Sequence, residues 1–118
     1  MTETSINARA FDFSQKLIKV YLGMEEKERS YLLSQKLLES SKSITSYADM
    51  AIRETSRMML MQGMEKAYLN ARETQRWLKL LESTELIDPI EVKRLKKECK
   101  KLIKMLKKVR KGFTPYYN

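Results

Sequence analysis

Residues 88–112 read DPIEVKRLKKECKKLIKMLKKVRKG, and this stretch indicates the class of fold most directly. It begins with Asp88, whose side chain can cap a first helical turn, and Pro89, which suits the first helical position. Glu91 stands where an acidic residue completes a capping box. Gly112 is the residue type that most often ends a helix in the left-handed conformation. The stretch is therefore predicted to be one long helix.

This predicted helix has one apolar face and one basic face. At about 100° per residue, its apolar side chains form a narrow stripe, with two more beside it. The stripe consists of Leu95, Cys99, Leu102, Leu106 and Val109, flanked by Val92 and Ile103. The opposite face carries Lys93, Lys96, Lys97, Lys100, Lys101, Lys104, Lys107, Lys108 and Lys111. The stripe requires other helices to bury it, whereas the basic face must meet solvent or an anionic partner.

The basic helix holds all of the excess charge of the chain. The 118 residues include 24 Lys and Arg and 15 Asp and Glu, which gives a net charge of +9. Residues 91–111 contain eleven of the basic residues and two of the acidic ones, so the rest of the chain is neutral. A positive charge concentrated in this way favours nucleic acid as the partner, with an anionic membrane surface second.

Three further helices are predicted before the basic one. Residues 6–22 carry a wide apolar arc and stop at Gly23, and residues 25–55 and 56–82 each continue a helical apolar spacing. Residues 40–46, SSKSITS, are polar but contain no Gly or Pro, so we interpret them as helix. Their small side chains favour close packing against a neighbouring helix, and a hinge is the alternative.

The predicted fold class is all-α, as one antiparallel up-and-down four-helix bundle. With only three Gly and two Pro, the chain has little of the turn chemistry that hairpin-rich folds need. Residues 1–118 are expected to form a single domain, with residues 113–118 as a short tail. The aromatic side chains of that tail can pack on the bundle or a neighbouring subunit, and stacking on bases is the alternative.

The third predicted helix has a second apolar set that lies away from its main stripe: Met59, Leu69, Trp77 and Leu80. A helix of a single bundle buries one face, so a second apolar face indicates a further contact, most simply with another subunit. A homo-oligomer is therefore expected, and the alternative is that Trp77 lies at the rim of the bundle. The methionines of residues 58–64 fit a core or a subunit interface better than a ligand groove.

Little catalytic chemistry is available, so we expect no enzyme activity, no catalytic residues and no cofactor. The absence of His and the single Cys exclude His-based catalysis, a disulfide within the chain, and His or multi-Cys metal sites. There is no Gly-rich phosphate-binding loop. Cys99 is interpreted as a small buried side chain, with a reactive thiol as the alternative. A lone thiol, no signal peptide pattern and no apolar run long enough to cross a membrane indicate a cytoplasmic protein.

The predicted function is non-enzymatic nucleic-acid binding through the basic face, with RNA favoured over DNA. Nine of the eleven basic residues are Lys, which offers a point charge but not the bidentate fork that reads bases. Binding is therefore expected to be weakly sequence-specific and strongly salt-dependent. The alternatives are a solvated basic helix, a protein–protein scaffold or accessory subunit, and binding to an anionic membrane surface.

Three segments carry a family resemblance: AFDFSQKLIKVY (residues 10–21), YLLSQKLLESSKSI (31–44) and YLNARETQRWLKLLESTELID (68–88). They resemble the four-helix-bundle proteins encoded within bacterial 23S rRNA intervening sequences. After Ser43-Ile44 that family commonly has Pro-Ala-Asn-Ile-Ala-Glu-Gly, whereas this chain has Thr-Ser-Tyr-Ala-Asp-Met-Ala. The resemblance implies a left-handed bundle that assembles as a ring, typically a pentamer. Relatives of that family are accessory proteins of diversity-generating retroelements, which bind nucleic acid and a protein partner. The resemblance therefore implies similar contacts for this chain.

Overall fold

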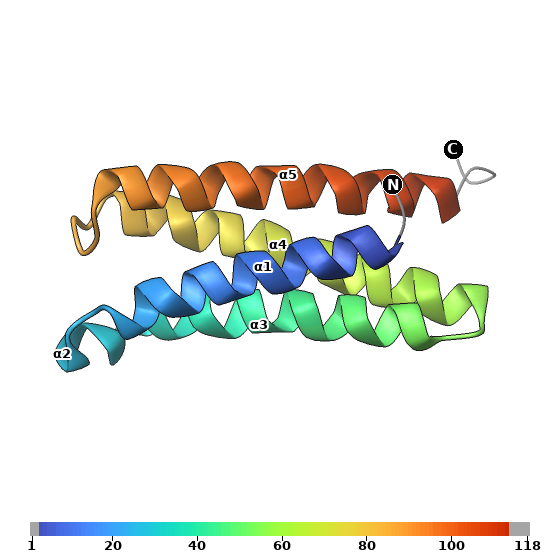
Figure 1. Ribbon diagram of the computed structural model, residues 1–118, viewed down its shortest axis with the longest axis horizontal. Helices are drawn as coiled ribbons and strands as arrows, with labels where there is room; N and C mark the ends of the chain where they lie inside the picture. Colours follow the sequence, from blue (N-terminus) through green and yellow to red (C-terminus); the bar gives the residue numbers. More distant parts are fainter. Residues whose placement is uncertain (1–2, 114–118) are drawn as a thin grey trace.

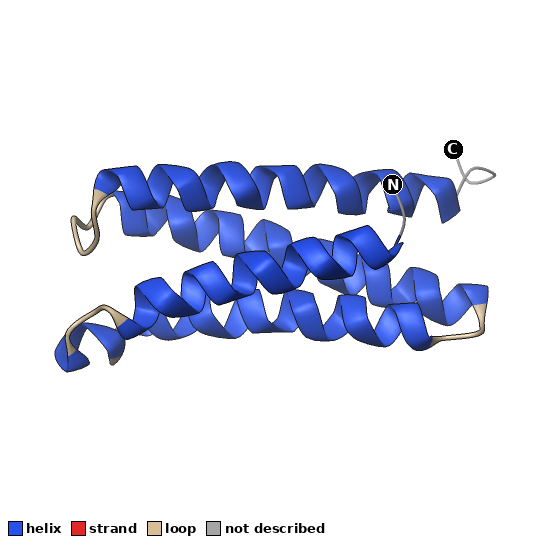
Figure 2. Cartoon of the chain, in the orientation of Figure 1, coloured by secondary structure: helices blue, strands red, loops and turns tan. Residues whose placement is uncertain are grey.

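The computed structural model describes residues 3–113, and side chains from residue 6 to residue 110. Over these residues the fold is all-α, with five helices and no strand (Figure 2). The helices are α1 (Glu3–Leu22), α2 (Glu26–Arg29), α3 (Leu32–Arg53), α4 (Arg57–Glu82) and α5 (Pro89–Phe113). The all-α class predicted from the sequence is confirmed.

The four long helices lie alongside one another, and successive ones run in alternating directions (Figure 1). α3 packs against α1 and α4, and α5 packs against α4 and α1, so each long helix contacts two others. Their apolar faces meet in one core that includes Ile6, Phe13, Ile44, Met64, Leu78 and Leu106. The result is an elongated globule of 46 × 23 × 21 Å.

The prediction of one continuous helix over residues 25–55 is wrong, because the helix is interrupted between α2 and α3. The backbone N–H of Glu25 donates to the Glu28 carboxylate at 3.2 Å, which starts α2 as an independent turn. At its end, the Ser30 hydroxyl donates to the Lys27 carbonyl at 2.6 Å, and the Ser34 hydroxyl donates to the Glu28 carbonyl at 2.7 Å. These hydroxyls satisfy the Lys27 and Glu28 carbonyls, which would accept backbone hydrogen bonds in a continuous helix. The interruption therefore costs little free energy.

Residues 40–46 are helical, as predicted, and their small side chains allow α3 and α4 to pack closely. Ser40 is buried at the contact, and the Thr74 hydroxyl of α4 donates to the Ser40 hydroxyl at 2.8 Å. Further along, a Cβ atom placed on Gly63 of α4 would lie 2.7 Å from the Cβ of Ala51 in α3. The interpretation of this segment as a close helix–helix contact is confirmed.

α5 begins as predicted but does not end at Gly112. The Asp88 carboxylate accepts a hydrogen bond from the Ile90 backbone N–H at 2.9 Å, so Asp88 caps the first turn. At the other end the helix continues through Gly112 to Phe113, and no described glycine has a positive φ. Glycine adopts the right-handed α conformation as readily as the left-handed one, so its presence does not by itself stop a helix. Residues 114–118, with Tyr116 and Tyr117, lie outside the described residues.

Candidate nucleic-acid interface

The apolar face of α5 fixes the helix against the rest of the molecule. Leu95, Cys99, Leu102 and Leu106 are buried, as are Val92 and Ile103 beside them, and Val109 is partly buried. Met105, which the sequence-based stripe omitted, is also buried. Because this face is occupied by the core, the opposite face of α5 must point outward.

Seven exposed lysines lie on that outward face, which we call the lysine face: Lys93, Lys97, Lys100, Lys101, Lys104, Lys107 and Lys108. None of the seven forms an ion pair with another side chain in the described part of the chain. From the first to the last they extend over about 22 Å of helix, at 1.5 Å per residue. The lysine face is therefore a row of positive charges that are not held in ion pairs by the described residues.

Lys96, which the sequence placed with these lysines, is directed toward α4 instead. Its ammonium lies 2.9 Å from the Glu82 carboxylate, and both side chains are about one third exposed. The hydrogen bond from Lys96 lowers the pKa of Glu82. A long lysine side chain at the edge of a helix face can turn either way, and helical spacing does not tell which. The side chain of Lys111 lies outside the described residues.

Arg110 is also held by α4. Its guanidinium lies 2.5 Å from the Glu65 carboxylate and 4.6 Å from the centre of the Tyr68 ring. On the same ring, the Arg72 guanidinium donates to the Tyr68 hydroxyl at 3.0 Å. Arg110 therefore links the C-terminal part of α5 to α4. The positive charge on the outward face of α5 consists mainly of lysine.

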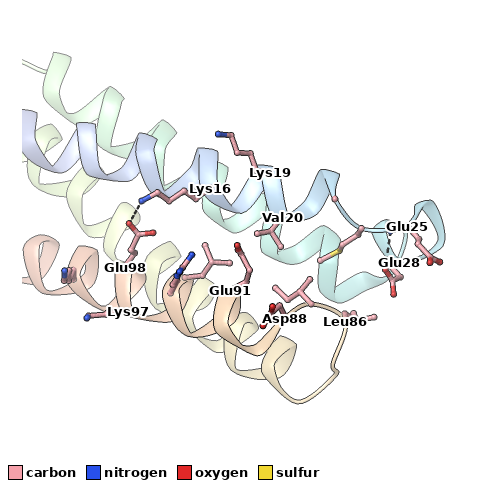
Figure 3. A pocket seen from close by; sticks show the side chains of 16 residues that line it. Lys16, Lys19, Val20, Glu25, Glu28, Leu86, Asp88, Glu91, Lys97 and Glu98 are labelled. Atoms are coloured by element: carbon pink, nitrogen blue, oxygen red, sulfur yellow. Dashed lines mark hydrogen bonds and ion pairs between the residues drawn. The ribbon is translucent and has the colours of Figure 1, made fainter.

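A groove of about 980 Å³ lies beside the lysine face, between the second half of α1 and the first half of α5 (Figure 3). Lys97 and Lys101 of the lysine face line it together with Lys16 and Lys19 of α1. The Lys16 ammonium lies 2.6 Å from the Glu98 carboxylate, which joins α1 to α5. Sequence reasoning did not assign Lys16 or Lys19 to a site, because only packing brings α1 next to α5.

The predicted oligomer-interface residues lie on α4, and most of them face outward. Leu69 is 54% exposed, Leu80 is 51% exposed and Met59 is 46% exposed. Trp77 is different, because it is partly buried against the core and its indole N–H donates to the Glu73 carboxylate at 3.3 Å. The outer surface of α4 therefore presents large apolar side chains at three of the four positions.

Cys99 is buried in the core between the helices, where its thiol is shielded from solvent. Burial raises the pKa of its thiol from 9.0 to about 12, and the thiol donates to the Ala71 carbonyl at 3.4 Å. The interpretation of Cys99 as a small buried side chain is confirmed. Among the described residues, no group of three or more Cys, Asp and Glu could hold a metal ion. No described helix is long and apolar enough to cross a membrane.

The thiol of Cys99 is expected to react at least about 10³-fold more slowly in the folded protein than in urea at pH 8. The reason is that a pKa of about 12 leaves little thiolate at pH 8. The folded state also retains the thiol proton, so the free energy of unfolding is unaffected below pH 9 and declines as the pH rises toward 12. Labelling with a chromogenic disulfide reagent measures the rate, and equal rates in the two states would contradict the burial.

A comparison with protein-family models matches residues 2–108 to the 23S rRNA-intervening sequence protein family. The chain belongs to this family. The family resemblance seen in the three sequence segments is thereby confirmed. No curated protein matches the chain.

The fold of this family member is shared by a solved structure from Bacteroides thetaiotaomicron, described as a protein with unknown function from the S23 ribosomal protein family. The two structures superpose with a TM-score of 0.86 at 22% sequence identity, over 94% of this chain and 99% of the other. At this level of identity the likeness shows a common fold. The substituted segment after Ile44 does not disturb it, because Thr45 remains helical and its hydroxyl donates to the Ala10 carbonyl of α1 at 3.1 Å.

Proposed function

We propose that this 23S rRNA-intervening sequence protein binds nucleic acid, RNA in preference to DNA, without catalysing a reaction. The observation that carries the proposal is the lysine face, with seven exposed lysines and no ion pair among the described residues. Each lysine that meets a phosphate releases counterions from the nucleic acid, and this release drives binding. The name of the family supports RNA as the nucleic acid.

The chemistry of the lysine face favours phosphate contacts over base contacts. Lysine ammonium groups are compact point charges, whereas specific reading of guanine uses the bidentate guanidinium of arginine. Arg110 is engaged by Glu65 and Tyr68, which further limits base reading from this helix. The proposed binding therefore depends on the charge and shape of the RNA more than on its sequence, and it requires no cofactor or metal. The proposed compartment is the cytoplasm.

We expect the dissociation constant for a structured RNA hairpin to rise about 10³-fold between 50 and 200 mM salt. If the seven lysines of the lysine face contact phosphates, a plot of the logarithm of the association constant against the logarithm of the salt concentration has a slope of about −5 to −6. Fluorescence anisotropy at several salt concentrations measures this slope, and hairpins of unrelated sequence should give similar values. A flat salt response would contradict the proposal, and a DNA duplex of the same length tests the preference for RNA.

The proposed assembly multiplies this surface. The four long helices would constitute an up-and-down four-helix bundle, and copies of it would form a homo-oligomeric ring through the outer surface of α4. The exposed Met59, Leu69 and Leu80, together with Trp77 at their edge, support this contact because apolar side chains gain by leaving water. The family resemblance implies five copies. A ring would display several lysine faces and raise the avidity for one RNA.

The solution mass tests the assembly. Light scattering is expected to give a multiple of the 14.0 kDa chain mass, five-fold for the implied ring. Replacing Leu69 and Leu80 by Asp should shift the mass toward that of one chain without unfolding it, because both side chains are exposed in the single chain. A monomeric wild-type protein would contradict the ring.

The alternative function is a protein–protein scaffold or accessory subunit with no direct role in nucleic-acid binding. The exposed methionines support it, because Met58 is 62% exposed and methionine suits adaptable protein contacts. This alternative predicts that a protein partner is retained after nuclease treatment and that purified chain shows no salt-dependent RNA affinity. The two outcomes of the RNA titration therefore separate the two functions.

A further inference from the structure

The groove between α1 and α5 has an apolar floor that solvent reaches. Its apolar lining residues come from α1, α5 and the two connections at one end of the molecule: Val20, Met24, Leu86, Ile87 and Leu95. Leu95 and Met24 are buried, whereas Val20, Leu86 and Ile87 are only partly buried against the core. Covering such a floor with a second apolar surface removes both surfaces from water, which lowers the free energy.

The charged side chains around this floor are sorted by sign along the groove. The end formed by α2 and the α4–α5 connection carries four acidic residues: Glu25, Glu28, Asp88 and Glu91. The end nearer the middle of the molecule carries four basic residues: Lys16, Arg94, Lys97 and Lys101. Lys19 of α1 lies between the two ends, level with Glu91 (Figure 3). At that basic end Glu98 pairs with Lys16 (Figure 3). Lys16 also pairs with Asp12 at 3.1 Å, so the positive charge of that end comes mainly from Arg94, Lys97 and Lys101. The groove therefore has a negative end and a positive end.

We propose that this groove binds an amphipathic helix of a partner protein that carries basic residues near its N-terminus and acidic residues near its C-terminus. Its apolar stripe would lie on Val20, Ile87 and Leu95. The positive end of its helix dipole would face Glu25 and Asp88, which adds to the attraction between the side chains. This proposal does not depend on RNA binding, because it concerns a different class of partner and the apolar floor of the groove lies outside the lysine face. Lys97 and Lys101 border both surfaces.

The dimensions of the groove set the length of the helix. From Asp88 to Lys101, α5 borders the groove over about 20 Å, which corresponds to a bound helix of roughly 14 residues at 1.5 Å per residue. Such a helix would be weakly stable alone, because basic residues near its N-terminus oppose the helix dipole. It would fold on the groove, where the acidic residues at one end and the basic residues at the other compensate those charges. RNA fits this groove poorly, because the acidic end repels phosphate.

Two designed peptides of 14 residues test the proposal on the full chain. Both have the same stripe of leucines; one has lysines in its first two turns and glutamates in its last two, and the other has the reverse order. The first peptide is expected to bind about tenfold more tightly, because several exposed charge pairs add while the same pairs repel in the second. It should also shift the NMR signals of Val20, Ile87 and Leu95.

A charge-exchanged variant provides the specific control. Lys101 and Glu91 lie ten residues apart on α5, are exposed and form no ion pair among the described residues. Lys101→Glu with Glu91→Lys should therefore leave the fold intact while reducing or inverting the preference between the peptides. Lys79→Glu with Glu54→Lys exchanges exposed charges outside the groove lining and should leave the preference unchanged.

Three outcomes would overturn the proposal. The first is equal affinity for the two peptides, or shifts on the outer surface of α4 in place of the groove. The second is concentration-dependent shifts of Val20 and Leu95 without peptide, which would show that a second copy of the chain occupies the groove. The third is displacement of the peptide by an RNA hairpin that shifts the same floor residues. If the wild-type chain prefers the first peptide but binds no RNA, the proposed function is overturned and the proposed helix-binding groove is not.

Discussion

Replacing Lys97, Lys100, Lys104 and Lys108 by Glu is expected to weaken binding to structured RNA by about 10³-fold or more at 100 mM salt. Each substitution removes one cation that meets phosphate and introduces a charge that phosphate repels, and close pairs contribute about 1 kcal/mol each even in water. The salt dependence should fall in parallel, because fewer counterions are released. Fluorescence anisotropy measures both quantities. The four side chains are exposed, so circular dichroism should show an unchanged helical fold.

The matched control makes the same change in net charge elsewhere. Substituting Glu for Arg9, Lys27, Lys42 and Lys79 alters one exposed basic residue in each of α1, α2, α3 and α4, and lowers the net charge by the same amount. At 100 mM salt, charges more than about 10 Å from a bound phosphate are largely screened, so this variant should lose much less affinity. Equal losses in the two variants would show that affinity follows net charge and would contradict a role for the lysine face.

The second large effect is expected from Gly63→Ala, which should lower the free energy of unfolding by about 1–2 kcal/mol. In an isolated helix this substitution would be stabilising by about 1 kcal/mol, because Ala has the higher helix propensity. In this protein the new Cβ would lie 2.7 Å from the Cβ of Ala51 and 3.2 Å from its Cα. Because both helices are held in the core, the added methyl group forces α3 and α4 apart. Urea denaturation measures the change.

A double-mutant cycle identifies the cause of that loss. Ala51→Gly removes the methyl group that the new side chain at position 63 would meet, so the two substitutions together should cost about 1–3 kcal/mol less than the sum of the single substitutions. Gly23→Ala is the matched control, because its Cβ would meet only the Lys19 and Val20 carbonyls at 3.5 Å, an ordinary contact. Additive effects of the two core substitutions would contradict a direct clash between α3 and α4.

Much of the fold was predictable because helical periodicity is a local property. The spacing of Leu95, Cys99, Leu102 and Leu106 indicated which face of α5 is buried, and those residues are buried. The helical interpretation of residues 40–46 also followed from local features, namely continued apolar spacing and the absence of Gly and Pro. The break at Ser30 was not predictable in this way, because it depends on competing side-chain hydrogen bonds that helical spacing does not describe.

The same limit applies to the candidate site. By itself, the sequence determined that α5 separates apolar from basic side chains and that the chain carries its excess charge there. Only the tertiary structure decided that Lys96 turns to Glu82 of α4 and that α1 and α5 border a groove with charges sorted by sign. It also decided that α3 and α4 approach each other too closely at Gly63 for a Cβ atom to fit there. The physical reason is that periodicity specifies the faces of each helix, whereas contacts between helices distant in sequence determine what each face meets.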